Sequence, residues 1–229
     1  MTTKLGGEAA ARAWDLEYGA GRYRDEPPLP FVADIVAAAR EHNLIAHEGL
    51  YIGCGNGRNY LALVDAGLEL VGVDISERAL AQLAERAPAR RDRLIHGDLT
   101  ALPAEARYPL VIGIQVFQHG SRATAHAHIA AAQARLLPGG LLCIRVNAVG
   151  TDLEYAHAVR ERHRDGGFTV CYRGGPKRGL DIHFFARAEL EALFAGYEAM
   201  LAPRVARTLR TPHTRGQWSQ WEAIWRKPS

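Results

Sequence analysis

The stretch Tyr51–Asn59, YIGCGNGRN, constrains the fold of this chain more than any other. An apolar run leads into glycines at alternate positions, Gly53, Gly55 and Gly57, and a helix-compatible stretch, RNYLALVDAG, follows. Glycine suits a tight turn between a strand and a helix because it accepts positive φ and lets a ligand approach the bare backbone. The free N–H groups at the start of the helix and the positive end of its dipole would face that ligand. The stretch therefore predicts a strand, a ligand-binding turn and a helix.

The spacing of the glycines argues against two other phosphate-binding turns. Arg58 stands where a GxGxxG dinucleotide fingerprint needs its third glycine, and the Gly-Lys-Ser/Thr ending of a P-loop is absent. Two later apolar runs end in acids, LELVGVD in Asp74 and RLIHGD in Asp98. Successive strands would thus each deliver a polar or glycine feature to the carboxyl edge of a sheet, where open α/β sheets bind ligands.

The set GCGNG, VGVDIS, HGDLT and LPGG, the last just before an apolar run, resembles the class I S-adenosylmethionine (SAM)-dependent methyltransferases. The resemblance covers residues 49–147 in family order. It implies a Rossmann-like methyltransferase fold, SAM as cofactor and methyl transfer as the reaction. The overall layout is most similar to compact small-molecule methyltransferases, including the tellurite-resistance type.

Alternating strand and helix patterns favour a doubly wound, mostly parallel sheet. The family resemblance makes it seven-stranded, with the last strand antiparallel. The expected strands are LYI at 50–52, then 69–74, 94–96, 110–115, 141–147, 200–209 and 217–226, and the expected helices are 31–44, 58–66, 76–88, 123–137 and 188–195. Ser76 is the expected N-cap of its helix.

We expect one domain over residues 1–229, since the length suits a single core and no linker or repeat interrupts the chain. Residues 1–48 would form a helical cap that folds over the bound cofactor, as the resemblance implies. Residues 150–180 are polar, basic and Gly-rich, and we expect a helix and a loop there, inserted as a lid after the fifth strand.

Composition narrows the class of protein. Hydrophobic residues make up 48% and charged residues 23%, which is ordinary for a globular protein, and the net charge is only +3. No apolar run is long enough to span a bilayer, and the first residues lack the apolar core of a signal peptide, so we expect a cytoplasmic protein without a membrane partner. The three cysteines form no CxxC pair, and the histidines show no HExxH spacing, so we predict neither disulfides nor a metal.

Asp74 follows the glycine turn by about 20 residues, where an acid meets the ribose in such sheets. A carboxylate suits a diol because it accepts two hydrogen bonds. The resemblance places adenine at Asp98 and Leu99, and the methionine portion at the glycines. The cofactor-binding residues predicted in this way are Gly53, Cys54, Gly55, Gly57, Asn59, Asp74, Ile75, Asp98, Leu99 and Gln115.

One position departs from the family pattern. The first motif usually has an acid two residues before its first glycine, and Tyr51 stands there. A tyrosine hydroxyl can hydrogen-bond, but it cannot neutralise a positive charge on the cofactor.

The stretch IQVFQHGSR after the fourth strand is where the acceptor should meet the cofactor. His119 is the candidate catalytic base, because imidazole titrates near neutral pH. The alternative to catalysis by His119 is a structural role at the start of a helix. The alternative to substrate binding is a salt bridge for Arg145, and packing on the core for the N-terminal tyrosines. The predicted substrate-binding residues are Tyr18, Tyr23, Gln118, His119, Arg145 and His183.

Missing motifs favour a small-molecule acceptor. Amino-methylating nucleic-acid enzymes of this superfamily carry Asp/Asn-Pro-Pro-aromatic after the fourth strand, and Gln115–Gln118 contains no proline. No cysteine has the Pro-Cys or Thr-Cys context of a cytosine-C5 nucleophile. An RNA or protein methyltransferase remains an alternative because of the basic insertion. A non-catalytic SAM-binding protein remains another because of Tyr51.

Overall fold

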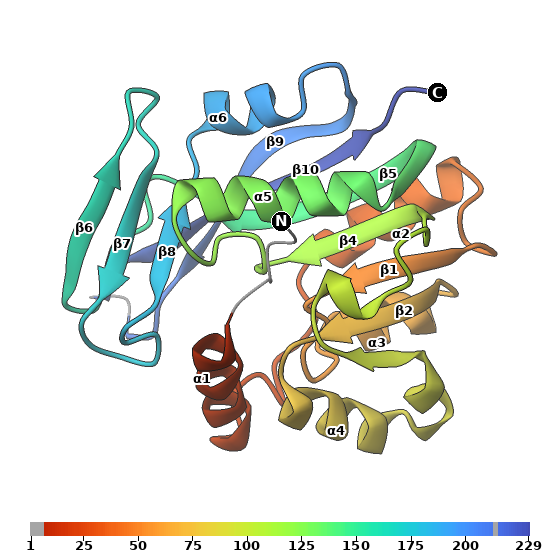
Figure 1. Ribbon diagram of the computed structural model, residues 1–229, viewed down its shortest axis with the longest axis horizontal. Helices are drawn as coiled ribbons and strands as arrows, with labels where there is room; N and C mark the ends of the chain where they lie inside the picture. The colour runs from red at the N-terminus through yellow and green to blue at the C-terminus, as the bar shows by residue number, and fades with distance from the viewer. Residues whose placement is uncertain (1–6, 213–214) are drawn as a thin grey trace.

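The computed structural model describes residues 7–212 and 215–229, so the first six residues of the expected cap lie outside it. Its main sheet has seven strands in the order β3-β2-β1-β4-β5-β10-β9 (Figure 1). These strands are β1 Glu48–Ile52, β2 Glu69–Asp74, β3 Leu94–His96, β4 Tyr108–Ile114, β5 Leu136–Asn147, β9 Glu198–Leu209 and β10 Gln217–Arg226. β10 runs antiparallel to both of its neighbours, and the other pairs are parallel, which confirms the predicted fold class.

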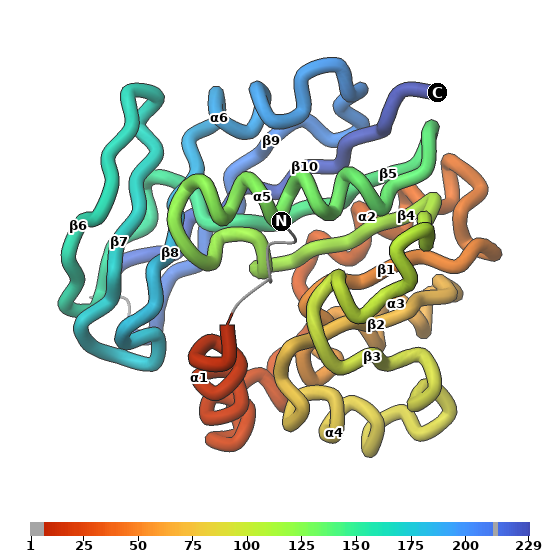
Figure 2. Tube along the Cα trace, in the orientation of Figure 1, coloured from red at the N-terminus to blue at the C-terminus, as the bar shows by residue number. Residues whose placement is uncertain are grey.

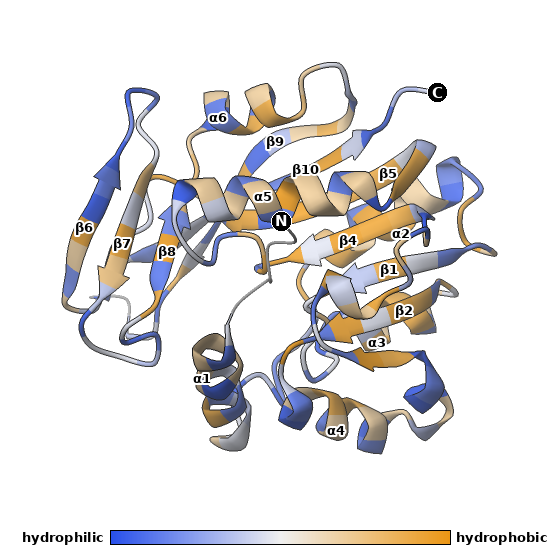
Figure 3. Ribbon diagram, viewed as in Figure 1, coloured by the Kyte–Doolittle hydropathy of each residue, from blue (hydrophilic) through white to orange (hydrophobic). Residues whose placement is uncertain are grey.

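Helices cover both faces of this sheet and define two cores. The helices are α1 Glu8–Gly19, α2 Phe31–Glu41, α3 Tyr60–Asp65, α4 Glu77–Arg86, α5 Arg122–Ala134 and α6 Arg187–Leu193, with 3-10 turns η1 Pro88–Arg93 and η2 Leu99–Ala101. Side chains of α5 and α6 pack on one face with Leu50 and Ile52, whereas α2, α3 and α4 pack on the other with Tyr51. Neighbouring residues of β1 thus serve opposite cores, as the two-residue period of a strand requires. Figure 3 shows the apolar residues concentrated on the central strands.

The insertion after β5 is a small antiparallel sheet, so the expected helix there is wrong. It comprises β6 His157–Arg162, β7 Phe168–Tyr172 and β8 Asp181–Phe184. Arg160 and Arg162 are both exposed, and their spacing of two residues matches the side-chain period of a strand. The β6–β7 turn is closed by the Gly166 amide, which donates to the His163 carbonyl, and Gly166 has φ +94°. Figure 2 shows the insertion standing at the end of the main sheet, beside the start of α5.

The order of the strands creates the site. The chain moves outward from β1 to β2 and β3, and then returns to place β4 on the other side of β1. At this reversal the connections leave in opposite directions and open a crevice at the carboxyl ends of the strands. Within the described residues, no helix is both long enough and apolar enough to cross a bilayer.

Candidate cofactor and acceptor site

The turn after β1 accepts only glycine at two positions. Gly53 and Gly55 have φ of +70° and +55°. A Cβ on Gly53 would lie 2.8 Å from a methyl carbon of Val116, and one on Gly55 would lie 2.4 Å from the Tyr18 hydroxyl. The turn is therefore pressed between the segment after β4 and the N-terminal helix. Gly57 also has positive φ, but a Cβ there would meet Leu83 of the core.

Asp74 ends β2 with its carboxylate buried beside that turn. The Gly55 amide donates to Oδ2 at 2.8 Å, and the Ser76 amide donates to Oδ1 at 2.9 Å. Burial raises the pKa of Asp74 to about 6, against the lowering effect of the two amides. A carboxylate has roughly four lone-pair sites. Asp74 thus keeps acceptor capacity for a diol while it braces the glycine turn.

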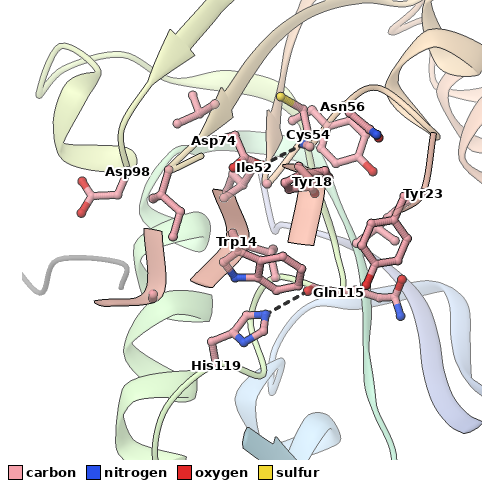
Figure 4. A pocket seen from close by; sticks show the side chains of 18 of the residues that line it. Trp14, Tyr18, Tyr23, Ile52, Cys54, Asn56, Asp74, Asp98, Gln115 and His119 are labelled. Atoms are coloured by element: carbon pink, nitrogen blue, oxygen red, sulfur yellow. Dashed lines mark hydrogen bonds between the residues drawn. The ribbon is translucent and has the colours of Figure 1, made fainter. Parts of the chain in front are cut away.

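A cavity of about 150 Å³ opens over the turn and the ends of β1, β2 and β4 (Figure 4). It gathers most of the predicted residues from separate parts of the chain. The cofactor-binding predictions that line it are Gly53, Cys54, Gly55, Asn59, Asp74, Ile75, Asp98 and Gln115. The substrate-binding predictions that line it are Tyr18, Tyr23, Gln118 and His119.

Four predicted residues lie outside this cavity. Gly57 faces Leu83, and Leu99 belongs to the core beneath α5. Arg145 is buried within the sheet, where its Nε lies 2.9 Å from Glu222 of β10. That ion pair is the salt-bridge alternative considered for Arg145.

His183, the fourth, is buried in the insertion. Its ring bonds to the Thr169 hydroxyl at 2.9 Å and to Glu189 at 2.9 Å. Glu189 also contacts His126 and Arg122, at 2.6 and 3.0 Å. His183 therefore serves a buried polar network between β7, β8, α5 and α6.

This network contains two groups with the ligand atoms of a metal site, one made of His126, His183 and Glu189 and the other of Glu161, His163 and His183. The guanidinium of Arg122 lies against the same Glu189 oxygen that joins the first group. A cation there would meet an existing positive charge. The prediction of no metal stays a prediction.

The segment after β4 is held by the insertion. The Gly120 amide donates to the Asp181 carbonyl, and the His183 amide donates to the Gln118 carbonyl, both at 2.8 Å. These bonds form an isolated antiparallel bridge between His119 and Ile182. Gln118 and His119 are thus aligned by backbone pairing with β8.

His119 is an uncharged imidazole in this setting. Its Nε2 lies 3.3 Å from the Gln115 carbonyl and donates to it, which leaves Nδ1 as the acceptor. Burial, followed by the charge of Lys177, lowers the pKa of His119 to about 3. Such a ring accepts a hydrogen bond readily but is a weak base. Its catalytic role stays a prediction.

Helix α1 covers the cavity through polar contacts. No residue of α1 is fully buried. Its Asp15 accepts from the Ser76 hydroxyl at 2.6 Å and from the Arg78 amide at 3.2 Å, both at the start of α4. Gln82 of α4 donates to the Tyr18 carbonyl at 3.0 Å. Trp14 contacts the ring of His119 edge-on, at 5.3 Å between centroids (Figure 4).

Asp98 lines the cavity near the end of β3 and also caps η2. Its Oδ1 accepts from the Thr100 amide at 2.8 Å. In Figure 4 its carboxylate is directed away from Trp14 and His119. The adenine-binding role of Asp98 stays a prediction.

Several cavity residues were not among the predicted site residues: Trp14, Asn56, His128 and Lys177. His128 is buried, and neither ring nitrogen has a hydrogen-bond partner among the described residues. His126, two residues earlier in α5, instead bonds to Glu189. The two histidines differ because residues two apart lie on different faces of a helix. The sequence held one signal for Lys177, since it is the only lysine between positions 5 and 226 of an Arg-rich chain.

The structure has the features expected from the resemblance to class I methyltransferases: a doubly wound seven-stranded sheet with one antiparallel strand, a glycine turn after β1 and an acid at the end of β2. Residues 50–140 match the family model described as "Methyltransferase domain". Over that stretch the chain therefore resembles methyltransferases, and its main sheet has the fold of the class I SAM-dependent enzymes. SAM is the cofactor that this likeness implies.

Solved structures with this fold act on different acceptors. One is 1,6-didemethyltoxoflavin-N1-methyltransferase of Burkholderia thailandensis, with TM-score 0.64 and 21% identity, covering 96% of this chain and 89% of that one. Another is CalS10, an amino pentose methyltransferase of Micromonospora echinaspora, with TM-score 0.59 and 19% identity, covering 93% of this chain and 96% of that one.

One curated relative is named for another kind of acceptor. A tRNA (guanine-N(7)-)-methyltransferase of Mycolicibacterium gilvum (strain PYR-GCK) is 32% identical over 154 residues. The match spans 57% of this chain and 56% of the relative.

The residues present fit SAM. Gly53 and Gly55 leave room for close approach, and Asp74 has acceptor capacity for the ribose hydroxyls. Buried polar atoms without partners among the described residues, Gln118 Oε1 and the two nitrogens of His128, belong to cavity residues and suit a polar ligand. Near the place expected for the amino-acid end of SAM, Tyr51 occupies the position of the family's usual acid, and its side chain bonds to Asn59.

Proposed function

We propose that this chain methylates a small-molecule acceptor that binds between the cofactor wall and the cover formed by α1 and the insertion. The observation that carries the proposal is the covered cavity. Trp14, Tyr18 and Tyr23 from the N-terminal segment and Lys177 from the insertion line the same space as the glycine turn. An acceptor that reaches the cofactor has to fit beneath these side chains.

When bound, SAM supplies a methyl group on a sulfonium sulfur, which a nucleophile displaces in line. The protein's part is to orient the acceptor and to exclude water, and orientation can contribute roughly 7–11 kcal/mol. Asp74 and the glycine turn fix the cofactor, and α1 with the insertion closes the space. We infer that His119 Nδ1 accepts a hydrogen bond or a proton from the acceptor.

We extend the proposal to domain organisation and location. We infer that residues 1–229 form one domain in which the N-terminal segment up to α2 is a cap and residues 150–180 are a lid. The expected cap ran to residue 48, but α2 packs in the core on a face of the main sheet and Glu48 begins β1. The three cysteines are free, which suits a reducing compartment such as the cytoplasm.

An RNA acceptor is the second candidate, and the tRNA methyltransferase relative is the observation that favours it. Exposed Arg160 and Arg162 of the insertion would then contact phosphates. The covered cavity weighs against it, because a large acceptor would have to pass beneath α1 and the insertion.

The deciding experiment is transfer of radiolabelled methyl from SAM into a cell extract that is then separated into RNA, protein and small molecules. At a SAM concentration near the wild-type dissociation constant, we expect label in the small-molecule fraction with wild type and much less with Asp74→Ala. Label in purified tRNA or in protein would overturn the proposal.

A further inference from the structure

Lys177 presents an ammonium group to the cavity without a matching anion. It lies between β7 and β8, in the insertion, and lines the cavity with Trp14 and His119. Over residues 7–212 and 215–229, its ammonium makes no hydrogen bond and no ion pair. Its recorded neighbours are two aromatic rings: Nζ lies 5.9 Å from the centroid of Trp14 and 6.0 Å from that of Trp218.

The nearby charges do not neutralise it. Glu17 is paired with Arg22 at 3.0 Å. Burial lowers the pKa of Lys177 to about 8, with Glu17 opposing the shift and Arg22 adding to it. Lys177 is therefore still mostly protonated at neutral pH. An ammonium taken out of water without a partner is unfavourable, so the site is poised to gain from a bound anion.

The carboxylates among the cavity-lining residues are Asp74 and Asp98, which lie at the ends of β2 and β3. The lining also holds the uncharged His119, the rings of Trp14 and Tyr23, and Lys177, while the Tyr18 ring lies against Gly55 on the Asp74 side. Flat aromatic walls favour a planar ligand through stacked or edge-on contacts. A cation among such walls selects for negative charge on that ligand.

We propose that Lys177 recognises an anionic oxygen on a planar acceptor, either a ring carboxylate or an ionised ring hydroxyl. The proposal rests on the proposed small-molecule function and names the chemical class of its acceptor. Trp14 and Trp218 hold the ammonium in place by cation–π contacts. Lys177 acts by binding and takes no part in the transfer of the methyl group.

The test is calorimetry on protein saturated with S-adenosylhomocysteine, which fills the cofactor wall without turnover. Two matched probe pairs are used: benzoate with benzamide, and 4-nitrophenolate with 4-nitroanisole. We expect the anion of at least one pair to bind ~10-fold tighter than its neutral partner, about the contribution of one charge-assisted bond. The pair that shows the preference tells whether a carboxylate or an ionised hydroxyl is recognised.

Variants separate this role from a structural one. Lys177→Met should abolish the preference, and Lys177→Arg should retain part of it. Arg178→Met, which removes an exposed cation from the neighbouring position, should leave it unchanged. Affinity for S-adenosylhomocysteine should be equal in all four proteins, which also shows that each is folded.

Three results would overturn the proposal: no anion preference or no measurable anion binding in wild type, a preference that survives in Lys177→Met, or weaker S-adenosylhomocysteine binding in that variant. The last would assign Lys177 to the cofactor. Failure of the proposed function would look different, since the extract assay would then place the label in RNA or protein.

Discussion

At the residue scale, Asp74 couples cofactor binding to pH. Burial raises the pKa of its carboxyl to about 6, so the carboxylate is lost as the pH falls below that value. A protonated carboxyl has fewer acceptor sites for the ribose diol. We expect SAM to bind roughly tenfold more weakly at pH 5 than at pH 7. Calorimetry at both values measures this.

The matched variants are Asp74→Ala and Asp74→Asn. The alanine variant should weaken SAM binding by roughly 1.5–3 kcal/mol at pH 7, the contribution of a charge-assisted hydrogen bond. The asparagine variant should bind SAM with an affinity that no longer changes between pH 5 and 7. Unchanged affinity in the alanine variant would remove Asp74 from the ribose site.

His119 should affect turnover and not cofactor affinity. His119→Ala removes the Nδ1 acceptor, so we expect turnover to fall by roughly 10²-fold, the lower end for a proton acceptor because burial lowers its pKa to about 3. Because the ring is neutral throughout, no ionisation of His119 should appear in the rate profile above pH 5. Unaffected turnover would make the residue structural.

Residues near the glycine turn were predictable, because their positions follow from local spacing along a strand and a turn. Asp74 lies at a fixed interval after Gly53, and the parallel sheet brings the two together. Lys177 and His128 were not predictable in this way. Each reaches the cavity from an element whose placement depends on long-range packing, and no local pattern marks it.

At the element scale, Asp15 joins α1 to the start of α4. Asp15→Ala should leave the α4 N-cap intact, since Ser76 still accepts from the Ala79 amide. Because α1 has no fully buried residue, loss of this link should let it open more often. We expect faster dissociation of S-adenosylhomocysteine and faster proteolysis within α1.

The control is Glu8→Ala, which removes an exposed pair with Arg12 at the far end of the same helix. It should change neither rate. If Asp15→Ala also leaves both rates at the wild-type values, α1 is not a mobile cover.

The insertion shows where element prediction fails. Its basic, Gly-rich sequence favoured a helix and a loop, but it forms β6, β7 and β8. The Thr169 and Val170 side chains are β-branched and pack better on a pleated sheet than on a helix. The two-residue spacing of Arg160 and Arg162 carried the strand signal. The charged side chains on the exposed face of the small sheet hid this strand signal, because apolar residues occupy only the face that packs inward.

At the scale of the whole molecule, Glu189 fastens the insertion to the main sheet. Burial would raise its pKa, but hydrogen bonds from His126 and His183 outweigh this and lower it to about 2. A carboxyl with a lowered pKa stabilises the fold above its unfolded pKa, near 4.5, and this stabilisation is lost as the pH falls toward 2. We expect Glu189→Ala to destabilise the protein by roughly 1–3 kcal/mol at pH 7, because it leaves the buried ring of His183 without one of its hydrogen-bond partners.

Denaturant unfolding measures this, with Glu191→Ala as the control. Glu191 makes only an exposed pair with Arg187 on the same helix, so its removal should cost less than about 1 kcal/mol. Equal stability of the two variants would show that the network adds nothing to the fold.

The overall topology was predictable because strand, helix and glycine signals alternate in one consistent order. The sheet order, the antiparallel β10 and the two cores agree with that pattern. The polar network that fastens the small sheet was not predictable, since it depends on contacts between residues more than 60 positions apart, such as His126 with Glu189.

The backbone bridge between His119 and Ile182 has an evolutionary consequence. The acceptor side of the cavity is aligned by β8 and the insertion, whereas the cofactor side is built on β1 and β2. Mutations in the insertion can therefore remodel the space offered to an acceptor while the glycine turn and Asp74 stay in place. Descendants of one ancestor can acquire new acceptors by this route without having to rebuild their means of holding the methyl donor.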